Sequence, residues 1–380
     1  MDAPQPTAPP RLAIGAMTGT SLDGLDAALV RITGRGLALR ADYLGMVSLD
    51  FPPSLRDALM LLASGRPLTA GFIVRSARWL GDLHAQAVVR LLAQHGNPRA
   101  DFLCAHGQTV WHEPGAAGAG VSWQLFDPWP TVRRCGVPVV YDLRQADLVA
   151  GGQGAPITPI TDPILYRQPA GIVFNLGGIC NATAWQASPA GMKIAGADIG
   201  PCNLVLDALA RSLVPNLPYD TDGLLASAGK ADAAAVAAIL RLIQDAKRGA
   251  RSLGREQYGA AFIHGLRQGP LADFSKEDAM ASAVEAVSHA LADYAKARPG
   301  LPVILAGGGA KNPALVAAVT RLVGPGSGVQ TSDTAGVPAQ AREAMAFAVL
   351  GALCQDRVPI TLPEITGATN PGVAGVWAHP

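Results

Sequence analysis

The stretch Ile14–Val30, IGAMTGTSLDGLDAALV, places glycines, hydroxyls and two carboxylates between two apolar runs. Phosphate groups are bound well by backbone N–H groups that can approach closely, and glycine permits that approach. Asp23 and Asp26 flank Gly24, and either could hold Mg²⁺ through water, because Mg²⁺ prefers few carboxylates and retained waters. The alternative is turn chemistry, in which aspartate bonds to the local backbone. The stretch therefore predicts a site for phosphate and metal.

Two further glycine turns follow apolar runs, one in GIVFNLGG at 171–178 and one in VILAGGGAKN at 303–312. The chain has no GxxxxGK[ST] and no GxGxxG that opens a helix after the first strand, so a P-loop or a dinucleotide fold is not expected. Two glycine hairpins facing one cleft could hold a triphosphate. The three glycines at 307–309 could let the backbone approach the base and sugar of a nucleotide closely. Each turn alone is also typical of an ordinary hairpin or βα turn. Together the three favour a nucleotide.

Composition excludes several classes of protein. The 380 residues are 49% hydrophobic and carry a net charge of +1, which predicts neither nucleic-acid nor membrane-surface binding. The five cysteines are scattered without a CxxC pair, so neither a disulfide scaffold nor a structural zinc site is expected, and a reducing cytoplasm fits. Residues 1–10 are proline-rich, which predicts a disordered N-terminal segment. No apolar run is long enough to span a bilayer.

Elements that could position the glycine turns are visible in the hydrophobic pattern. The first half predicts a β-meander, then two helices, then two short strands. Their ranges are 12–16, 27–32 and 37–49 for the meander, 53–65 and 71–96 for the helices, and 101–105 and 138–141 for the short strands.

The pattern restarts at Gly171 with strands expected over 171–176, 179–185 and 192–197. Helices are expected to dominate from Asn203 to Ala297, and a strand at 303–306 precedes helices at 313–323 and 339–356. Two halves that both open with a meander predict an α/β fold of two related lobes with a cleft between them. We place the lobes at 1–165 and 166–380, with the last residues packing on the first lobe.

Eight motifs, in chain order, resemble the anhydro-N-acetylmuramic acid kinase family over Leu12 to the closing TGATNPGVAG. They are MTGTSLDGLD, AHGQTVWH, DLRQAD, GGQGAP, NLGGICN, DIGPCN, GGGAKN and EAMAFA. The resemblance implies a two-lobed actin-like ATPase fold made of duplicated ribonuclease H-like lobes, with the active site in the interlobe cleft. It also implies ATP and Mg²⁺ as cofactors, a cytoplasmic location and a homodimer.

The reaction that the resemblance implies is unusual. Water attacks the anomeric carbon of 1,6-anhydro-N-acetylmuramic acid, the anhydro ring opens, and the freed 6-oxygen takes the γ-phosphoryl group of ATP. Asp198, in DIGPCN, is the expected general base, since it follows an apolar strand and precedes a helix starting near Pro201. The alternative is that Asp198 only caps this helix.

Nucleotide binding is expected at all three glycine turns. In the first turn, Thr20 and Ser21 could donate to phosphate oxygens while Gly19 and Gly24 let the backbone close in, with Mg²⁺ at Asp23 or Asp26. The full set of expected ATP-binding residues is Gly19, Thr20, Ser21, Leu22, Asp23, Gly24, Asn175, Gly177, Gly178, Gly307, Gly308, Gly309 and Asn312.

The sugar is expected on the other motifs. The match of AHGQTVWH favours a sugar-side role for His106 and Gln108, although an isolated histidine at a strand end is more often structural. Asp142 and Arg144 would face the same side of an extended segment, and a guanidinium suits the lactyl carboxylate of a muramic acid. The alternative is an internal Asp142–Arg144 ion pair. Asp147 belongs to the same expected polar wall.

Two other functions fit the same fold. One is a kinase for a different sugar, which a panel of sugars would distinguish. The other is a non-catalytic ATP-binding switch or chaperone-like ATPase. No peptide-binding domain or DNA-reading helix pair is visible in the sequence, and a switch would not need the sugar-side residues. ATP hydrolysis that rises only with the anhydro sugar separates the kinase from the switch.

Overall fold

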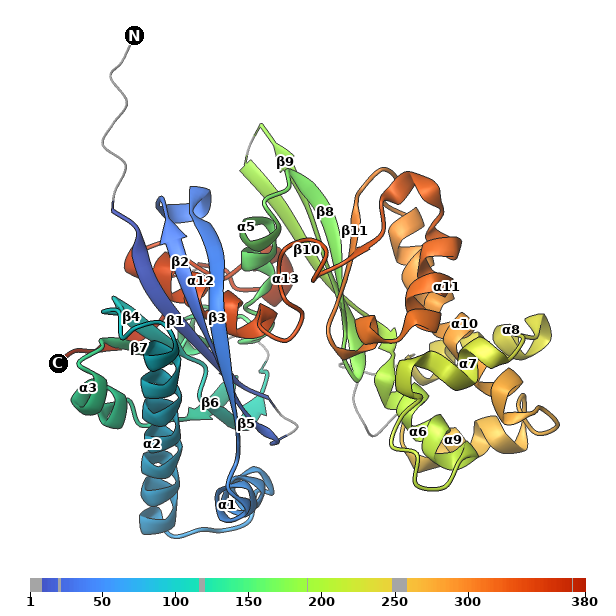
Figure 1. The fold of residues 1–380 in the computed structure, drawn as a ribbon, viewed down its shortest axis with the longest axis horizontal. Helices are drawn as coiled ribbons and strands as arrows, with labels where there is room; N and C mark the ends of the chain where they lie inside the picture. Colours follow the sequence, from blue (N-terminus) through green and yellow to red (C-terminus); the bar gives the residue numbers. More distant parts are fainter. Residues whose placement is uncertain (1–8, 20–21, 116–119, 190, 248–257, 371) are drawn as a thin grey trace. The chain divides into compact units, whose positions relative to one another are not determined.

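The computed structural model describes residues 9–19, 22–115, 120–189, 191–247, 258–370 and 372–380. The chain forms two compact units, each shown in Figure 1. Unit 1 contains the residues up to Gln168 together with Ala341–Pro380, and unit 2 is the continuous segment Pro169–Gln340. The stretch after Gln340 therefore returns to unit 1, whereas the sequence pattern predicts a second lobe over 166–380 with only its last residues packing on the first.

Unit 1 is built on a mixed six-stranded sheet with the order β13-β7-β4-β1-β2-β3. The first three strands form an antiparallel meander, β4 lies parallel to β1, and β7 lies parallel to β4. A separate hairpin, β5–β6, follows β4. The strands are β1 (Arg11–Thr18), β2 (Gly24–Thr33), β3 (Arg40–Asp50), β4 (Phe102–Ala105), β5 (Gln108–Glu113), β6 (Val121–Leu125), β7 (Val139–Tyr141) and β13 (Val376–Ala378).

Helices pack on both faces of this sheet because successive strand residues point to opposite sides. Ile14 and Ala16 of β1 share a core with the apolar side of α2, while Gly15 lies against α12. Thr69 caps α2 by accepting a hydrogen bond from the Phe72 N–H. The helices of unit 1 are α1 (Pro53–Ala63), α2 (Ala70–Gln94), α3 (Trp129–Cys135), α4 (Gln145–Val149), α5 (Asp162–Tyr166), α12 (Arg342–Gln355) and α13 (Pro363–Thr366).

Gly15 is where α12 approaches the sheet most tightly, and Gly15→Ala should therefore destabilise unit 1. A Cβ at this position would lie 1.8 Å from the Ala344 carbonyl oxygen and 2.4 Å from the Ala348 nitrogen, both backbone atoms that cannot move alone. We expect a loss of about 1–3 kcal/mol in the free energy of unfolding, measured by urea denaturation. Gly71→Ala is the control, because its Cβ would meet only the flexible Arg75 side chain, at 3.2 Å. Equal stability of the two variants would contradict this packing.

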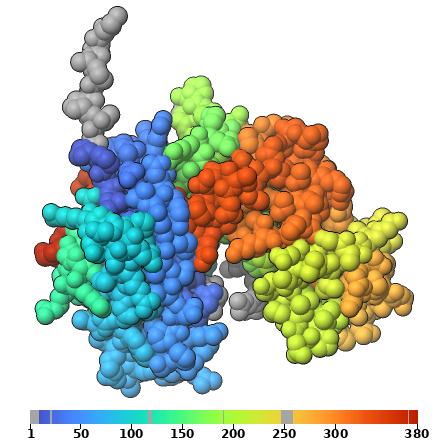
Figure 2. All heavy atoms as spheres, viewed as in Figure 1, coloured from blue at the N-terminus to red at the C-terminus, as the bar shows by residue number. Residues whose placement is uncertain are grey.

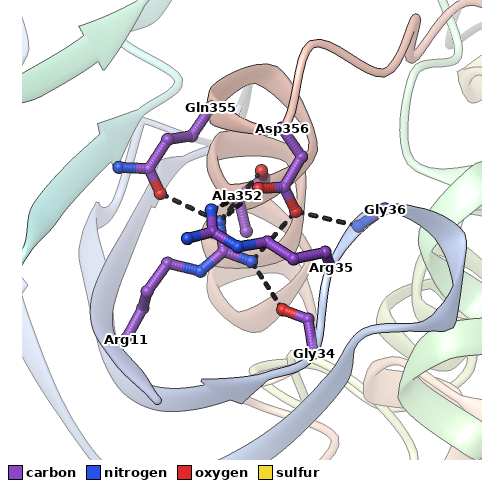
Figure 3. Close-up of polar contacts among 7 residues, drawn as sticks. All are labelled: Arg11, Gly34, Arg35, Gly36, Ala352, Gln355 and Asp356. Carbon is purple, nitrogen blue, oxygen red and sulfur yellow. Dashed lines mark hydrogen bonds and ion pairs between the residues drawn. The ribbon is translucent and has the colours of Figure 1, made fainter. Parts of the chain in front are cut away.

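A buried ion-pair cluster fastens the C-terminal end of α12 to the start of β1 (Figure 3). Arg11 donates from Nη1 and Nη2 to the two carboxylate oxygens of Asp356, at 2.8 and 3.0 Å. Arg35 Nη1 and the Gly36 N–H also donate to this carboxylate, at 2.7 and 2.9 Å. Burial alone would raise the pKa of Asp356, but these hydrogen bonds outweigh it and hold the pKa below its usual range.

Unit 2 repeats the sheet topology of unit 1. Its order is β10-β9-β8-β11-β12, in which β8, β9 and β10 form the antiparallel meander, β11 lies parallel to β8, and β12 lies parallel to β11. If the β5–β6 hairpin and β13 are left aside, the strands of each sheet, numbered in chain order, stand in the order third, second, first, fourth and fifth, as in a ribonuclease H-like lobe. The strands are β8 (Ala170–Leu176), β9 (Ile179–Ser188), β10 (Gly191–Pro201), β11 (Val303–Ala306) and β12 (Gln330–Thr331).

The helices of unit 2 share one hydrophobic core with its sheet and lie to one side of it in Figure 1; Figure 2 shows the surface they present, in yellow-green to orange. They are α6 (Asn203–Leu213), α7 (Leu224–Ala228), α8 (Ala233–Lys247), α9 (Ala260–Gln268), α10 (Lys276–Lys296) and α11 (Pro313–Val323). The duplicated topology confirms the predicted actin-like α/β class. Within the described residues, no helix combines the length and apolar character that crossing a bilayer requires.

Candidate functional site

The first glycine turn, between β1 and β2, is tied to the loop between β4 and β5. Gln108 Nε2 donates to the Gly19 carbonyl at 3.2 Å, and Thr18 Oγ1 donates to the Gly107 carbonyl at 2.6 Å. Leu22 adopts a left-handed backbone, with φ of 57°, as the chain leaves the turn. Gln108 is 1% exposed, and its Oε1 atom has no hydrogen-bond partner among the residues that the structure describes. The structure thus brings the MTGTSLDGLD and AHGQTVWH motifs together, while Thr20 and Ser21 lie outside the described residues.

The two carboxylates of this turn differ in their surroundings. Asp23 is exposed, whereas Asp26 is half-buried on β2 and accepts a hydrogen bond of 2.5 Å from Ser48 Oγ. Burial raises the pKa of Asp26, and the negative charge of Asp23 adds to the rise. Gly24 is required by the close approach of β3, because a Cβ would lie 2.5 Å from the Leu49 carbonyl oxygen. Across the described ranges, no three His, Cys, Asp or Glu side chains gather to hold a metal.

Buried His106 and half-buried Arg144 form a hydrogen-bonded pair beside this turn. Arg144 donates from Nη2 to His106 Nε2 at 2.9 Å and from Nη1 to the Gly154 carbonyl at 2.8 Å. Burial and the positive charge of Arg144 lower the pKa of His106 to about 3, so the imidazole is neutral and its Nε2 can accept this bond. Within the described residues, Arg144 Nε and His106 Nδ1 have no hydrogen-bond partner. With Gln108 Oε1, the pair offers two unused donors and one unused acceptor.

Asp142 and Asp147 take different positions around Arg144. Asp142 is half-buried at the end of β7, has φ of 57° and a pKa raised by burial, and forms no ion pair with Arg144 in the described part of the chain. The alternative of an internal Asp142–Arg144 pair is therefore not observed. Asp147 is completely buried and accepts hydrogen bonds from the Gly154 N–H and the Thr366 hydroxyl, both at 2.6 Å. Its carboxylate fixes the 151–154 loop through these bonds and is not accessible from the surface.

The second glycine turn, between β8 and β9, is seated on the N-terminus of α6. The Gly178 carbonyl accepts from the N–H groups of Cys202 and Leu204, at 2.9 and 3.0 Å, and the Gly177 carbonyl accepts from the Asn203 N–H at 3.0 Å. These bonds occupy donors at the start of the helix that could otherwise bind an anion. Phosphate contacts from this turn would therefore come from the turn itself, where Gly178 is exposed.

Asp198 lies exposed near the end of β10, opposite Asn181 of β9. Asn181 Nδ2 donates to Asp198 Oδ1 at 2.9 Å. A β-bulge follows between Asp198 and Gly200, a feature that re-aims side chains. The N-cap of α6 is Cys202, with no side-chain cap bond, so Asp198 is not the helix cap that the alternative required. Burial raises the pKa of Cys202 to about 12, as expected for an inert packed thiol.

A cavity of about 330 Å³ in unit 2 adjoins the third glycine turn. Gly308, Gly309 and Asn312, three of the residues expected to bind ATP, line it, and Asn312 also caps α11 by accepting from the Leu315 N–H. Gly307 packs against the second turn, because a Cβ there would lie 2.7 Å from Asn175 Oδ1. The second and third turns are thus adjacent. The remaining lining residues are Asn203, Leu206, Asp207, Tyr219, Asp220, Thr221, Asp222 and Lys311.

Those eight lining residues were not predicted. Asn203 and Lys311 stand inside the DIGPCN and GGGAKN motifs, which could have indicated them. Asp220 is buried and accepts from the N–H groups of Leu225 and Ala226, so it shapes the start of α7. The 219–222 segment, YDTD, has no periodicity, and only its turn-forming aspartates mark it in the sequence.

Comparison with known proteins agrees with the motifs. The family described as Anhydro-N-acetylmuramic acid kinase matches residues 11–379. Among curated relatives, an anhydro-N-acetylmuramic acid kinase from Salinibacter ruber is 36% identical, covering 94% of each chain. One from Bordetella avium is also 36% identical, covering 97% of this chain and 96% of its own. The solved xylulose kinase from Rhodospirillum rubrum has a TM-score of 0.44 and 11% identity, covering 90% of this chain and 91% of that one. The chain belongs to the anhydro-N-acetylmuramic acid kinase family.

Proposed function

We propose that this protein uses ATP and water to convert 1,6-anhydro-N-acetylmuramic acid into N-acetylmuramic acid 6-phosphate and ADP, as a step in peptidoglycan recycling. The observation that carries this proposal is the family match over residues 11–379, a range that contains all eight motifs. The residues that are assigned roles below come from both units.

Asp198 acts as the general base in this proposal. Its carboxylate accepts a proton from water, and the water oxygen bonds to the anomeric carbon while the bond from that carbon to the 6-oxygen breaks. The 6-oxygen then bonds to the γ-phosphorus as the bond to the bridging oxygen of ADP breaks. The exposed position of Asp198, beside a bulge and steadied by Asn181, supports this role because a base must be reachable and oriented.

ATP is bound by the glycine turns and the cavity of unit 2. The cavity, with Gly308 and Gly309 in its wall, takes the base and ribose, and the turns at Gly19 and at Gly177–Gly178 contact the phosphates. Asp23 is the better candidate for Mg²⁺, because Asp26 is half-buried and its pKa is raised. The ion would neutralise charge on the phosphates.

The sugar is bound on the side of His106, Gln108, Asp142 and Arg144. The unused hydrogen-bonding atoms of Gln108 and Arg144 support this assignment, because buried polar atoms without partners are rare and costly. Arg144 meets the lactyl carboxylate, and neutral His106 holds its guanidinium. Asp147 contributes by shaping the loop around them.

The test is ADP release with Mg-ATP and 1,6-anhydro-N-acetylmuramic acid, followed by mass spectrometry of the product. We expect strong release only with this sugar, and a product heavier than the simple phosphorylated anhydro sugar by one water. The control sugars are N-acetylmuramic acid, N-acetylglucosamine and 1,6-anhydroglucose. Release with a control sugar alone would assign another kinase substrate. ADP release that does not depend on any sugar would indicate an ATPase. A product without the added water would disprove ring cleavage.

A further inference from the structure

The last helix of the chain holds the loop that follows α4. Thr366, at the end of α13, donates from its hydroxyl to Asp147 Oδ1 at 2.6 Å, and its carbonyl accepts from the Gln153 N–H at 3.0 Å. The Thr369 N–H donates to the Ala150 carbonyl at 2.8 Å. Thr366 is 2% exposed and Asp147 is 0% exposed, so water cannot readily replace the bond between them. The C-terminal segment thus fixes three points of the 147–153 stretch.

The same loop is linked to Arg144 by hydrogen bonds. Asp147 Oδ2 accepts from the Gly154 N–H at 2.6 Å, and the Gly154 carbonyl accepts from Arg144 Nη1 at 2.8 Å. The chain is wrapped tightly around the carboxylate, since a Cβ at Gly152 would lie 2.3 Å from Asp147 Oδ2. Arg144 Nη2 is held on its other side by His106. One continuous series of hydrogen bonds therefore joins Thr366 to the guanidinium.

We propose that Thr366 is a positioning residue for recognition of the sugar acid. Its hydroxyl fixes Asp147, Asp147 fixes Gly154, and Gly154 with His106 sets the guanidinium of Arg144 at the substrate carboxylate. This inference rests on the proposed function, in which Arg144 meets the lactyl group. A planar guanidinium binds a carboxylate well only in a defined orientation, so a small displacement weakens binding without changing charge.

The test compares Thr366→Val, which removes only the hydroxyl from a similar shape, with the wild type. We expect the KM for the anhydro sugar to rise roughly tenfold, as for a lost buried hydrogen bond, while the KM for ATP stays unchanged. Preference for the sugar with its lactyl group over 1,6-anhydro-N-acetylglucosamine should fall. Thr366→Ser should restore the wild-type values, because it keeps the hydroxyl. Thr320→Val is the matched control, since its exposed hydroxyl bonds to the Val316 carbonyl of its own helix in unit 2.

Calorimetric binding of the anhydro sugar gives a second readout that does not depend on turnover. If Thr366→Val proves unfolded, Thr366→Ala removes the same hydroxyl and leaves room for a water beside Asp147. A wild type that binds and turns over the sugar, with variants that change only the melting temperature, would overturn the positioning role alone. Equal rises in both KM values would overturn it too. A wild type that neither binds nor turns over the sugar would overturn the proposed function, and this inference with it.

Discussion

Asp198→Asn should lower sugar-dependent ADP release by about a hundredfold or more, the expected loss when a general base is removed. Asparagine has nearly the same shape and can still accept a hydrogen bond from Asn181, so the local structure should persist. It cannot accept a proton from water at neutral pH. We therefore expect kcat to fall while the KM values for sugar and ATP change little, as for an interaction made only during the chemical step.

The matched control for Asp198→Asn is Asp273→Asn, which makes the same chemical change at an exposed carboxylate elsewhere in unit 2. This control should keep wild-type activity. Steady-state kinetics with both substrates varied gives the required comparison. Persistent activity in Asp198→Asn would place the base on another carboxylate, and an equal fall in the control would point to a general effect of lost charge on the unit.

Asp356→Ala should be the most damaging substitution for stability. It removes the carboxylate that pairs with Arg11, and their side chains are only 5% and 7% exposed. Arg11 would be left as a buried charge without its partner at the junction of β1 and α12 (Figure 3), a change that typically costs about 3–5 kcal/mol. We expect the urea midpoint of unit 1 to fall accordingly, with the loss distinguishable by a probe in each unit.

Arg35→Ala separates burial from simple ion pairing in this cluster. Arg35 contacts the same carboxylate, but its side chain is 53% exposed, so its removal should cost no more than about 1 kcal/mol. If the two variants lost equal stability, burial would not be the reason that the Arg11–Asp356 pair matters. An unchanged midpoint in Asp356→Ala would mean that the cluster contributes nothing to the fold.

The meanders were predictable because apolar runs separated by glycine turns can form few structures other than paired antiparallel strands. The β5–β6 hairpin was not, because its large apolar residues Trp111, Val121 and Trp123 are exposed, whereas its polar residues Gln108 and Ser122 are buried. Helix α12 was predicted as a helix, but its position in unit 1 was not. It is buried on nearly all sides, and its uniformly apolar sequence could have indicated a central helix of unit 1.

The site was predictable where backbone geometry demands a residue type, and less so elsewhere. Gly24, Gly307 and Gly309 could be identified because neighbouring backbone or buried side chains leave no room for a Cβ. Asp147 lies in the DLRQAD motif. Its burial and its hydrogen bond to Thr366, however, depend on a contact between residues 219 positions apart, which no local pattern contains. The same holds for the cavity wall at Asp220 and Asp222, which depends on how α6, α7 and α11 pack.

The placement of unit 2 inside the sequence of unit 1 has a consequence for how the protein is made. A ribosome completes Pro169–Gln340 before it has added Ala341–Pro380, so unit 2 has its whole sequence while unit 1 still lacks α12 and β13. During that interval the face of the first sheet around Gly15 has no helix to cover it. Unit 2 can therefore fold before unit 1 is complete, in contrast to the usual order in which the N-terminal domain folds first. An uncovered apolar sheet face favours aggregation until α12 emerges from the ribosome.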